Sequence, residues 1–271
     1  MPTDEQRALW AAIRAHPDED TPRLVYADWL QEHGDGIRAE FIRLQCAIAR
    51  QPTDRKTQRK VLRALDHRER VLYMAHRVQW AAPLFRALVG PRPSARPESW
   101  VRGVGIRFRR GFVSELRLDL DGIHRIMTAG ADLEPTFDLL VAQGFPRYNP
   151  KKLAEVFSWD GVSCMSRLTF AGATDHSVDS IVTSTTARLT YLEFTYSEIT
   201  DAGAIAISEW PRGAGLTSLS LRAGQIGDRG AAALADSPYL GAITELNLLQ
   251  NPIGPTGRRR LVSRFGGAVV L

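Results

Sequence analysis

Two carboxylates and a histidine stand close together near the N-terminus of this chain. Asp28 and Glu32 are four residues apart, so a helix would place them on one face, and His33 follows them directly. This set could bind a metal ion or carry out acid–base catalysis. The alternative, which we favour, is a solvated helix face whose acids cap the helix or pair with Arg38 and Arg43.

The other residue types that carry out catalysis show no recognised spacing. The six histidines form no HExxH pair, and Cys46 and Cys164 are far apart and outside any CxxC pair. The sequence has no GxSxG nucleophile turn, no Walker loop and no dinucleotide-binding glycine loop. We therefore expect no catalytic residue, no metal site and no cofactor. An enzyme with an unrecognised site remains an alternative.

Basic residues are concentrated in the middle of the chain. Residues 1–49 carry a net charge of −4 (5 basic, 9 acidic), residues 50–117 carry +12 (17 basic, 5 acidic) and residues 118–271 carry −3 (13 basic, 16 acidic). The basic segment could bind nucleic acid, an acidic protein or the acidic ends of the same chain. Its candidate anion-binding side chains are Arg55, Lys56, Arg59, Lys60, Arg63, Arg107, Arg109 and Arg110.

A repeat dominates the C-terminal half. Leu192, Leu219 and Leu246 are evenly spaced, and each lies within a segment of the type Leu-x-x-Leu-x-Leu. The same spacing relates three further sets of residues, which are Ile199, Ile226 and Ile253, then Gly203, Gly230 and Gly257, and finally Ile207, Leu234 and Leu261. A fixed period of this kind is typical of a solenoid, whose units bury apolar residues only against their neighbours.

Each repeat unit predicts a strand followed by a helix. The leucine segments predict strands of a parallel sheet, with a degenerate copy at 165–170 and a closing strand at 268–271. Asp201 and Asp228 stand where they could N-cap the helices that follow. In the irregular outer copies, Asp175 takes the place of the isoleucine and Pro255 takes the place of the aspartate.

The segment Leu-Ser-Leu-Arg-Ala-Gly-Gln-Ile-Gly-Asp-Arg-Gly-Ala-Ala-Ala-Leu at 219–234 resembles leucine-rich repeats of the ribonuclease-inhibitor type. The likeness covers about residues 165–266. It implies a curved stack with parallel strands on the concave face and helices outside. It implies nothing specific about function, because one fold serves many functions.

The first eighty or so residues predict a small helical bundle, with helices at about 4–16, 22–33, 37–50 and 54–80. The second helix is expected to place Leu24, Val25 and Trp29 on its inner face, with Tyr26 and Leu30 flanking them. The third is expected to bury Ile37, Phe41, Leu44 and Ile48. A proline-rich stretch at 90–97 follows. Strands are then expected at 104–108 and 112–118, joined by a turn at 109–111.

The stretch from Asp20 to Asp35, DTPRLVYADWLQEHGD, followed by RAEFIRLQ from Arg38, resembles the bacterial repeat-companion domain. That module occurs at the N-terminus of proteins that carry leucine-rich or similar repeats. The likeness covers about residues 4–50, with a weaker match at 110–113. It implies a companion of an interaction array and no reaction.

Together these patterns predict an α/β protein with an N-terminal helical bundle followed by a short leucine-rich-repeat solenoid. The expected parts are a helical companion module at 1–88, a linker and irregular region at 89–164, and the repeats at 165–271. The favoured binding site is the concave strand face, made of Arg167, Thr169, Tyr191, Glu193, Ser218, Ser220, Arg222, Glu245, Asn247 and Leu249.

The expected function is that of a cytoplasmic, non-enzymatic interaction or scaffold protein with a protein partner. A nucleic-acid-associated adaptor that binds through residues 50–117 is the first alternative, and we rank it lower because no nucleic-acid-reading motif occurs. No membrane span is expected, because the sequence has no apolar run of about 18 residues. The partner's identity, the pathway and the oligomeric state are left open.

Overall fold

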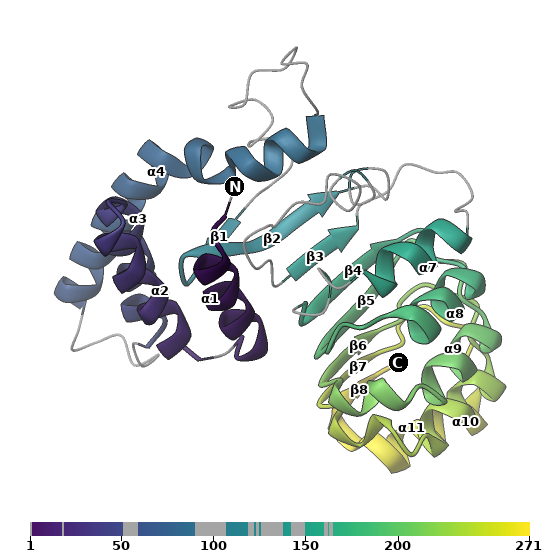
Figure 1. The fold of residues 1–271 in the computed structure, drawn as a ribbon. Helices are drawn as coiled ribbons and strands as arrows, with labels where there is room; N and C mark the ends of the chain where they lie inside the picture. Colours follow the sequence, from purple (N-terminus) through teal and green to yellow (C-terminus); the bar gives the residue numbers. More distant parts are fainter. Residues whose placement is uncertain are drawn as a thin grey trace. The chain divides into compact units, whose positions relative to one another are not determined.

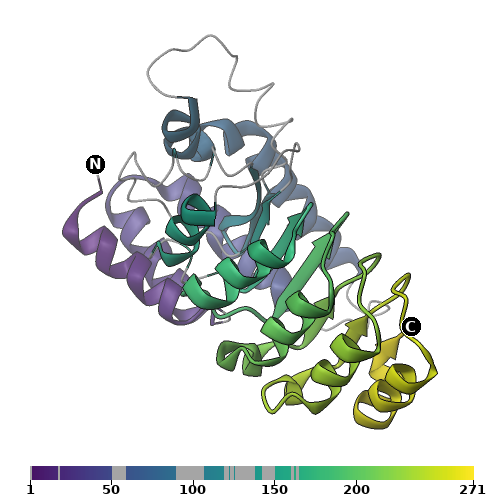
Figure 2. The ribbon, with the colours of Figure 1, turned by 90° about the vertical axis from the view of Figure 1, so that its right-hand side faces the viewer.

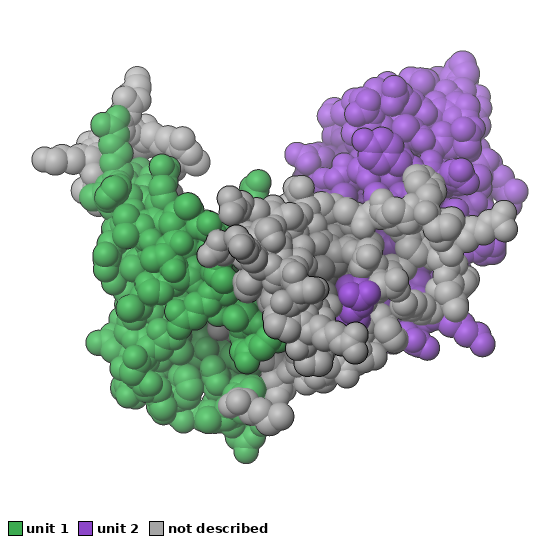
Figure 3. All heavy atoms as spheres, turned by 90° about the horizontal axis from the view of Figure 1, so that it is seen from above, with its two compact units in different colours: residues 1–116, 128–137 green, residues 117–127, 138–271 purple. Residues whose placement is uncertain are grey.

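The computed structural model describes residues 2–17, 19–50, 59–89, 107–118, 122, 125, 138–141, 150–159, 162 and 165–271. The chain divides into two compact units, which Figure 3 shows in green and purple. Unit 1 comprises residues 1–116 and 128–137, and unit 2 comprises residues 117–127 and 138–271. The segment 107–116, which lies in the linker region expected from the sequence, therefore belongs with the N-terminal helices.

Unit 1 contains helices α1 (Asp4–Ala15), α2 (Thr21–Glu32), α3 (Gly36–Ala49) and α4 (Arg59–Val89) (Figure 1). Side-chain oxygens cap the N-termini of two of these helices. The hydroxyl of Thr3 accepts a hydrogen bond from the backbone N–H of Gln6, and the carboxylate of Asp35 accepts one from the N–H of Arg38. Each bond satisfies a backbone donor that the first turn of a helix leaves without an intrahelical partner.

The buried faces of α2 and α3 agree only in part with the predicted ones. Helix α2 buries Arg23, Tyr26, Ala27 and Leu30, while Val25 is 49% exposed; helix α3 buries Arg38, Ala39, Phe41, Ile42, Gln45 and Cys46, while Ile37 is 47% exposed. Phe41 is buried as predicted, and Tyr26 and Leu30, which were expected to flank the inner face of α2, are buried too. The predicted burial of Val25 and Ile37 was wrong, because Arg23, Arg38 and Gln45 occupy positions on the inner faces. Successive residues of a helix are about 100° apart around its axis, so the burial of these three polar residues turns the inner face of each helix away from the predicted one.

Strands β1 (Arg107–Arg109) and β2 (Phe112–Leu118) form an antiparallel hairpin. Its two turn residues, Arg110 (φ 51°) and Gly111 (φ 89°), are both left-handed, as a type I′ turn requires. A Cβ on Gly111 would lie 2.3 Å from Cγ1 of Ile42, so the turn approaches α3 too closely for any side chain there. Phe112 is fully buried, and its ring lies 5.8 Å from that of Tyr26. The hairpin is thus part of the core of unit 1.

Unit 2 alternates strands and helices. Its strands β3 (Asp138–Val141), β4 (Arg167–Ala171), β5 (Tyr191–Thr195), β6 (Ser218–Ser220), β7 (Glu245–Asn247) and β8 (Val269–Val270) pair in parallel in chain order. The helices α7 (Pro150–Ser158), α8 (Asp175–Ser184), α9 (Asp201–Ser208), α10 (Asp228–Asp236) and α11 (Pro255–Phe265) stand side by side along one face of this sheet (Figures 1 and 2). The predicted α/β fold, with N-terminal helices and C-terminal repeats, is confirmed.

The repeat residues form the core between the sheet and the helices. Leu192, Leu219 and Leu246 are paired in register across β5, β6 and β7 and are at most 1% exposed. Ile199, Ile226 and Ile253 are also buried. The period seen in the sequence therefore marks the side chains that each unit stacks on its neighbours.

The aspartates at the helix starts cap the next helix and not their own. Helices α9 and α10 have Thr200 and Gly227 as their N-cap residues, so the predicted N-cap roles of Asp201 and Asp228 are wrong. Instead Asp201 accepts hydrogen bonds from the N–H groups of Gly227 (2.7 Å) and Gly230 (2.9 Å) in the following repeat. Asp228 likewise accepts one from Gly257 at 3.0 Å. The carboxylates therefore join successive repeats.

The first copy of the repeat also takes part in this series of aspartate hydrogen bonds. Asp175 begins α8 and accepts hydrogen bonds from the N–H groups of Thr200 and Gly203, both at 2.9 Å, so it corresponds to Asp201 and not to an isoleucine. Ala173 corresponds to Ile199, because its carbonyl accepts from the next repeat as that of Ile199 does. The alignment was wrong because the loop of this copy is shorter. Pro255 does stand at the first turn of α11, where α8, α9 and α10 have aspartate.

Candidate functional site

The face of the sheet opposite the helices carries two rows of polar side chains. One row runs Arg167, Tyr191, Ser218 and Glu245 across β4 to β7, and the other runs Thr169, Glu193, Ser220 and Asn247. Alternate strand residues point to opposite faces, so the buried leucines between them fix this orientation. These eight members of the predicted set are therefore brought together in register, and we call them the strand-face rows.

The β4–β5 end of the strand-face rows is a network around Glu193. Its Oε2 accepts hydrogen bonds from the hydroxyls of Tyr191 (2.8 Å) and Thr169 (3.3 Å). The guanidinium carbon of Arg167 lies 3.8 Å from the centre of the Tyr191 ring, a cation–π contact. Partial burial, followed by the hydrogen bond and negative charge of Glu193, raises the pKa of Tyr191 to about 12, and Glu245 adds to the effect. The Tyr191 hydroxyl is thus held as a donor.

The β6–β7 end carries shorter side chains. The hydroxyl of Ser218 donates to Oε2 of Glu245 at 3.1 Å, and Oδ1 of Asn247 accepts from the N–H of Leu249 at 3.1 Å. Ser220 is 8% exposed, and within the described part of the chain its hydroxyl has no hydrogen-bond partner. Arg222, the ninth predicted residue, and Leu249, the tenth, follow the ends of β6 and β7 and lie outside the strands.

Sequence reasoning missed an exposed aromatic residue beside these rows. Tyr196 is 83% exposed and has a left-handed backbone, with φ 50°. Gly172, Ala223 and Gln250 are also left-handed, and Tyr196, Ala223 and Gln250 have the same spacing as the leucines of the repeat. Gly172 occupies the equivalent position in the first copy, and a glycine there is a sequence signal for a left-handed backbone. Each repeat thus turns sharply after its strand, and one of them presents a tyrosine there.

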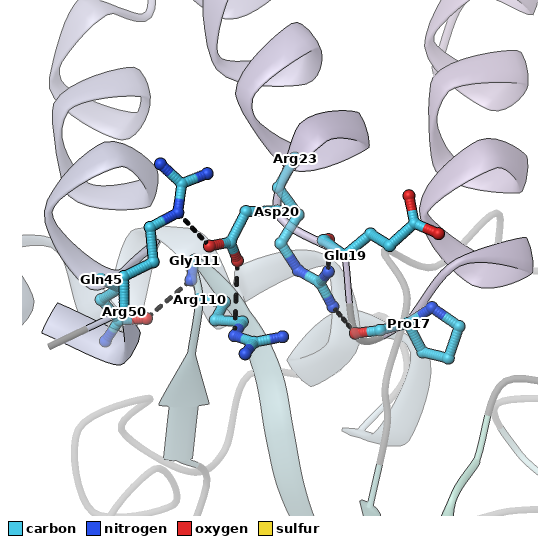
Figure 4. A network of polar contacts seen from close by, with 8 residues as sticks. All are labelled: Pro17, Glu19, Asp20, Arg23, Gln45, Arg50, Arg110 and Gly111. Atoms are coloured by element: carbon cyan, nitrogen blue, oxygen red, sulfur yellow. Dashed lines mark hydrogen bonds and ion pairs between the residues drawn. The ribbon is translucent and has the colours of Figure 1, made fainter. Parts of the chain in front are cut away.

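Several residues of the basic segment pair with acids of unit 1. Arg110 lies 3.4 Å from Asp20, whose other oxygen lies 2.7 Å from Arg50 (Figure 4). Arg68 donates two hydrogen bonds to Glu40, which lower the pKa of that carboxyl. The acidic N-terminal helices therefore neutralise part of the basic segment.

The other members of the predicted anionic-partner patch are spread over α4 and the hairpin. Arg63, Arg107 and Arg109 are exposed. Arg59 and Lys60 lie in the first turn of α4, where their side chains are outside the described structure, and Arg55 and Lys56 are outside the described residues.

The carboxylates and histidine near the N-terminus are engaged with neighbours in unit 1. Asp28 pairs with Arg43 at 2.6 Å, one of the two arginines expected for a solvated helix face. The ring of His33 stacks on Trp29 with centroids 4.0 Å apart, and its Nδ1 lies 2.8 Å from the Trp29 carbonyl oxygen. Glu32 is exposed. This arrangement favours the structural interpretation of the set.

Polar residues of α2 and α3 hold the hairpin turn and the loop before α2 (Figure 4). Gln45 accepts a hydrogen bond from the N–H of Gly111 at 2.6 Å and donates to the carbonyl of Phe108 at 3.3 Å. The buried Arg23 donates to the carbonyl oxygens of Pro17 and Glu19. Arg38 lies over the ring of Trp80 at 4.6 Å. These polar residues therefore connect helices, loop and hairpin.

Other functional groups give no site in the described structure. No group of three or more His, Cys, Asp or Glu side chains there could hold a metal ion. Among the described helices, none has the length and apolar character that a membrane span requires. Cys46 is buried, and burial together with the nearby Asp20 raises the pKa of its thiol to about 12.

Comparison with known families agrees with the repeat geometry. A family model described as "Leucine Rich repeat" matches residues 189–208 and 216–235. The first match covers β5 and α9, and the second covers β6 and most of α10. No curated protein matches the chain significantly. The part of unit 2 from Leu189 to Ala235 therefore consists of two leucine-rich repeats.

Proposed function

We propose that this protein is a non-enzymatic interaction or scaffold protein and that its strand-face rows dock a protein partner. The observation that carries the proposal is the register of these rows. Eight side chains, mostly polar, are aligned across β4 to β7 on the face that the helices leave uncovered. The fold is held by the opposite face, where the leucines are buried, so these outward residues are free to serve recognition.

The N-terminal helices and hairpin fit a supporting role, as the likeness to the companion module implies. Their arginines pair with acids of the same unit at Asp20, Asp28 and Glu40. These internal pairs reduce the charge available to an external anion. We therefore place the docking site on unit 2 and treat nucleic-acid binding as an outcome that the experiment must distinguish. A cytoplasmic location is part of the proposal.

The test is a pull-down from native lysate, with and without nuclease. The wild type is compared with Glu193→Arg plus Asn247→Arg, which places two bulky cations on the strand-face rows. A matched control, Asp179→Arg plus Glu209→Arg, makes the same kind of change at exposed residues of unit 2 outside the rows. Circular dichroism establishes that each variant is folded.

The expected result is a protein that co-purifies with the wild type and the control despite nuclease and is lost from the strand-face variant. Recovery of nucleic acid, or of partners that disappear only after nuclease treatment, would move the function to residues 50–117. Equal recovery with both variants would remove the strand-face rows from consideration.

A further inference from the structure

The strand-face rows contain unused hydrogen-bonding groups on three neighbouring strands. In the described part of the chain Ser220 has no hydrogen-bond partner, although it is 8% exposed. Its register neighbours are Glu193 on β5 and Asn247 on β7. Both hydrogen bonds to Glu193 use Oε2, and the one to Asn247 uses Oδ1. Adjacent strands are about 4.8 Å apart, so these groups form a closely spaced row.

Negative charge flanks the serines of β6 on both sides. Glu193 on β5 is in register with Ser220, and Glu245 on β7 is in register with Ser218, so the two glutamates lie diagonally across β6 with their backbones about 12 Å apart. Neither carboxylate has a salt-bridge partner among the described residues. Ser218 and Ser220 have the shortest side chains of these rows, so they leave space between the two glutamates. A cation that enters there would have a carboxylate at each end of this diagonal and the hydroxyl of Ser220 beneath it.

The chain's own contacts show that the neighbouring β4–β5 end of the strand-face rows accepts a guanidinium group. Arg167 places its guanidinium on the face of Tyr191, at 3.8 Å from the ring centre, next to Glu193. Glu193, and to a smaller extent Glu245, contribute to the raised pKa of Tyr191. Arg167 lies on the β4 side of Tyr191, away from the serines of β6.

We infer that the strip between Glu193 and Glu245, with Ser218 and Ser220 as its floor, binds an arginine side chain of the partner. This inference rests on the proposed docking function and names the chemistry that the surface recognises. A guanidinium has five N–H donors in a planar fork, so it can bond to a carboxylate through two N–H groups and to the hydroxyl of Ser220 through a third. An ammonium group is a compact point charge and bonds to fewer of these acceptors in their fixed directions. The partner segment is therefore arginine-bearing and basic.

The test uses the full-length, isotope-labelled protein and a short peptide of glycine and serine that carries one arginine. Backbone amide shifts are followed by NMR as the peptide is added at low salt. The inference expects the largest shifts at Ser218, Ser220 and their register neighbours. It expects a matched peptide with lysine in place of arginine to bind more weakly, by roughly fivefold or more.

Variants localise the interaction. Glu193→Gln and Glu245→Gln keep the shape of the side chains and remove the charge, and each is expected to weaken binding about tenfold. Ser220→Ala should weaken binding by a smaller factor without lowering the thermal unfolding temperature, because this hydroxyl bonds to nothing in the described chain. Arg167→Gln removes a neighbouring positive charge and should tighten binding. The control, Asp179→Asn plus Glu209→Gln, removes two exposed acids of unit 2 and should change the dissociation constant less than about twofold.

Three outcomes would overturn the inference: shifts that centre elsewhere, equal binding of the lysine peptide, or the same loss in the control as in the glutamate variants. None of them decides the docking proposal. If the lysate partner is lost from Glu193→Arg plus Asn247→Arg while the arginine peptide fails, the surface docks a partner of different chemistry. If the peptide binds as expected and no lysate partner depends on the strand-face rows, the arginine site is supported and the proposal of a wider docking surface is refuted.

Discussion

The carboxylate of Asp201 accepts a hydrogen bond from the backbone N–H of Gly230 at 2.9 Å, so the first residue of α9 caps the first turn of α10. The same oxygen also accepts from Gly227. A Cβ on Gly230 would lie only 2.6 Å from this oxygen. The aspartate and the glycine of the repeat are therefore required together, since the glycine leaves room for the carboxylate of the preceding unit.

Replacing the aspartate should loosen the stack. Asp201→Ala removes two charge-assisted hydrogen bonds, and we expect a loss of about 2 kcal/mol in the free energy of unfolding. Urea denaturation followed by circular dichroism measures this change. Asp236→Ala is the matched control: its carboxylate is exposed and pairs only with Arg260 among the described residues, so the expected loss is below about 1 kcal/mol. Equal losses in both variants would contradict the capping role.

Gly230→Ala should destabilise the protein although alanine is the better helix former. The gain from helix propensity is about 1 kcal/mol, but the new Cβ would meet Asp201 Oδ1 at 2.6 Å and Ile226 Cγ2 at 2.9 Å. We expect a net loss of about 1–3 kcal/mol by urea denaturation. Gly36→Ala, in the first turn of α3, has no atom within 4 Å of its new Cβ and should be neutral or stabilising. A stabilised Gly230→Ala variant would show that the repeats can move apart at little cost.

The contact between the hairpin turn and α3 can be separated from the backbone strain of the turn. Gly111 and Gly34 both have a left-handed φ, 89° and 87°, but of these two only Gly111 would place a Cβ against a neighbour, at 2.3 Å from Ile42. Gly34→Ala should therefore cost about 1 kcal/mol, and Gly111→Ala should cost roughly 3 kcal/mol or more. Hydrogen exchange of the α2 and α3 amides reports the loss in unit 1. Similar effects in the two variants would argue against tight docking of the hairpin.

The thiol of Cys46 should resist modification in the native protein. Its pKa of about 12 is raised above the ordinary value, so the folded state favours the neutral thiol. This contribution to stability is fully present below the unfolded pKa of about 8.5 and is lost as the pH rises towards 12. In a Cys164→Ser background, reaction with Ellman's reagent at a pH of about 8 should be slow in buffer and fast in urea. Fast reaction of the native protein would mean that Cys46 is accessible.

Tyr196 should be more useful for binding than for stability. A left-handed tyrosine is strained by roughly 1–2 kcal/mol, and at 83% exposure its side chain gains little from packing. Tyr196→Gly relieves the strain but adds freedom to the unfolded chain, so we expect a gain of up to about 1 kcal/mol. Thr195→Gly, at the neighbouring strand residue, has no such strain to relieve and should destabilise. Thermal unfolding of both variants checks the prediction, and destabilisation by Tyr196→Gly would assign the tyrosine a structural role.

The repeats were predictable because their information is local and periodic. Evenly spaced leucines specify which strand positions face the core, and the intervening positions must then face outward. The rows from Arg167 to Glu245 and from Thr169 to Asn247 follow from this alternation alone. The turn at Arg110 and Gly111 was likewise predictable from its residue types.

What only the tertiary structure decided concerns polar residues whose partners lie outside their own helix. Arg23, Arg38 and Gln45 are buried against carbonyl groups, aromatic rings and the hairpin turn, and no helical period in α2 or α3 reveals those partners. Asp201 looks like the cap of its own helix, and only the stacking of neighbouring repeats shows that it caps the next one. A sequence specifies which residues are apolar. Whether a polar residue can be buried depends on the hydrogen-bond partners that the fold brings to it.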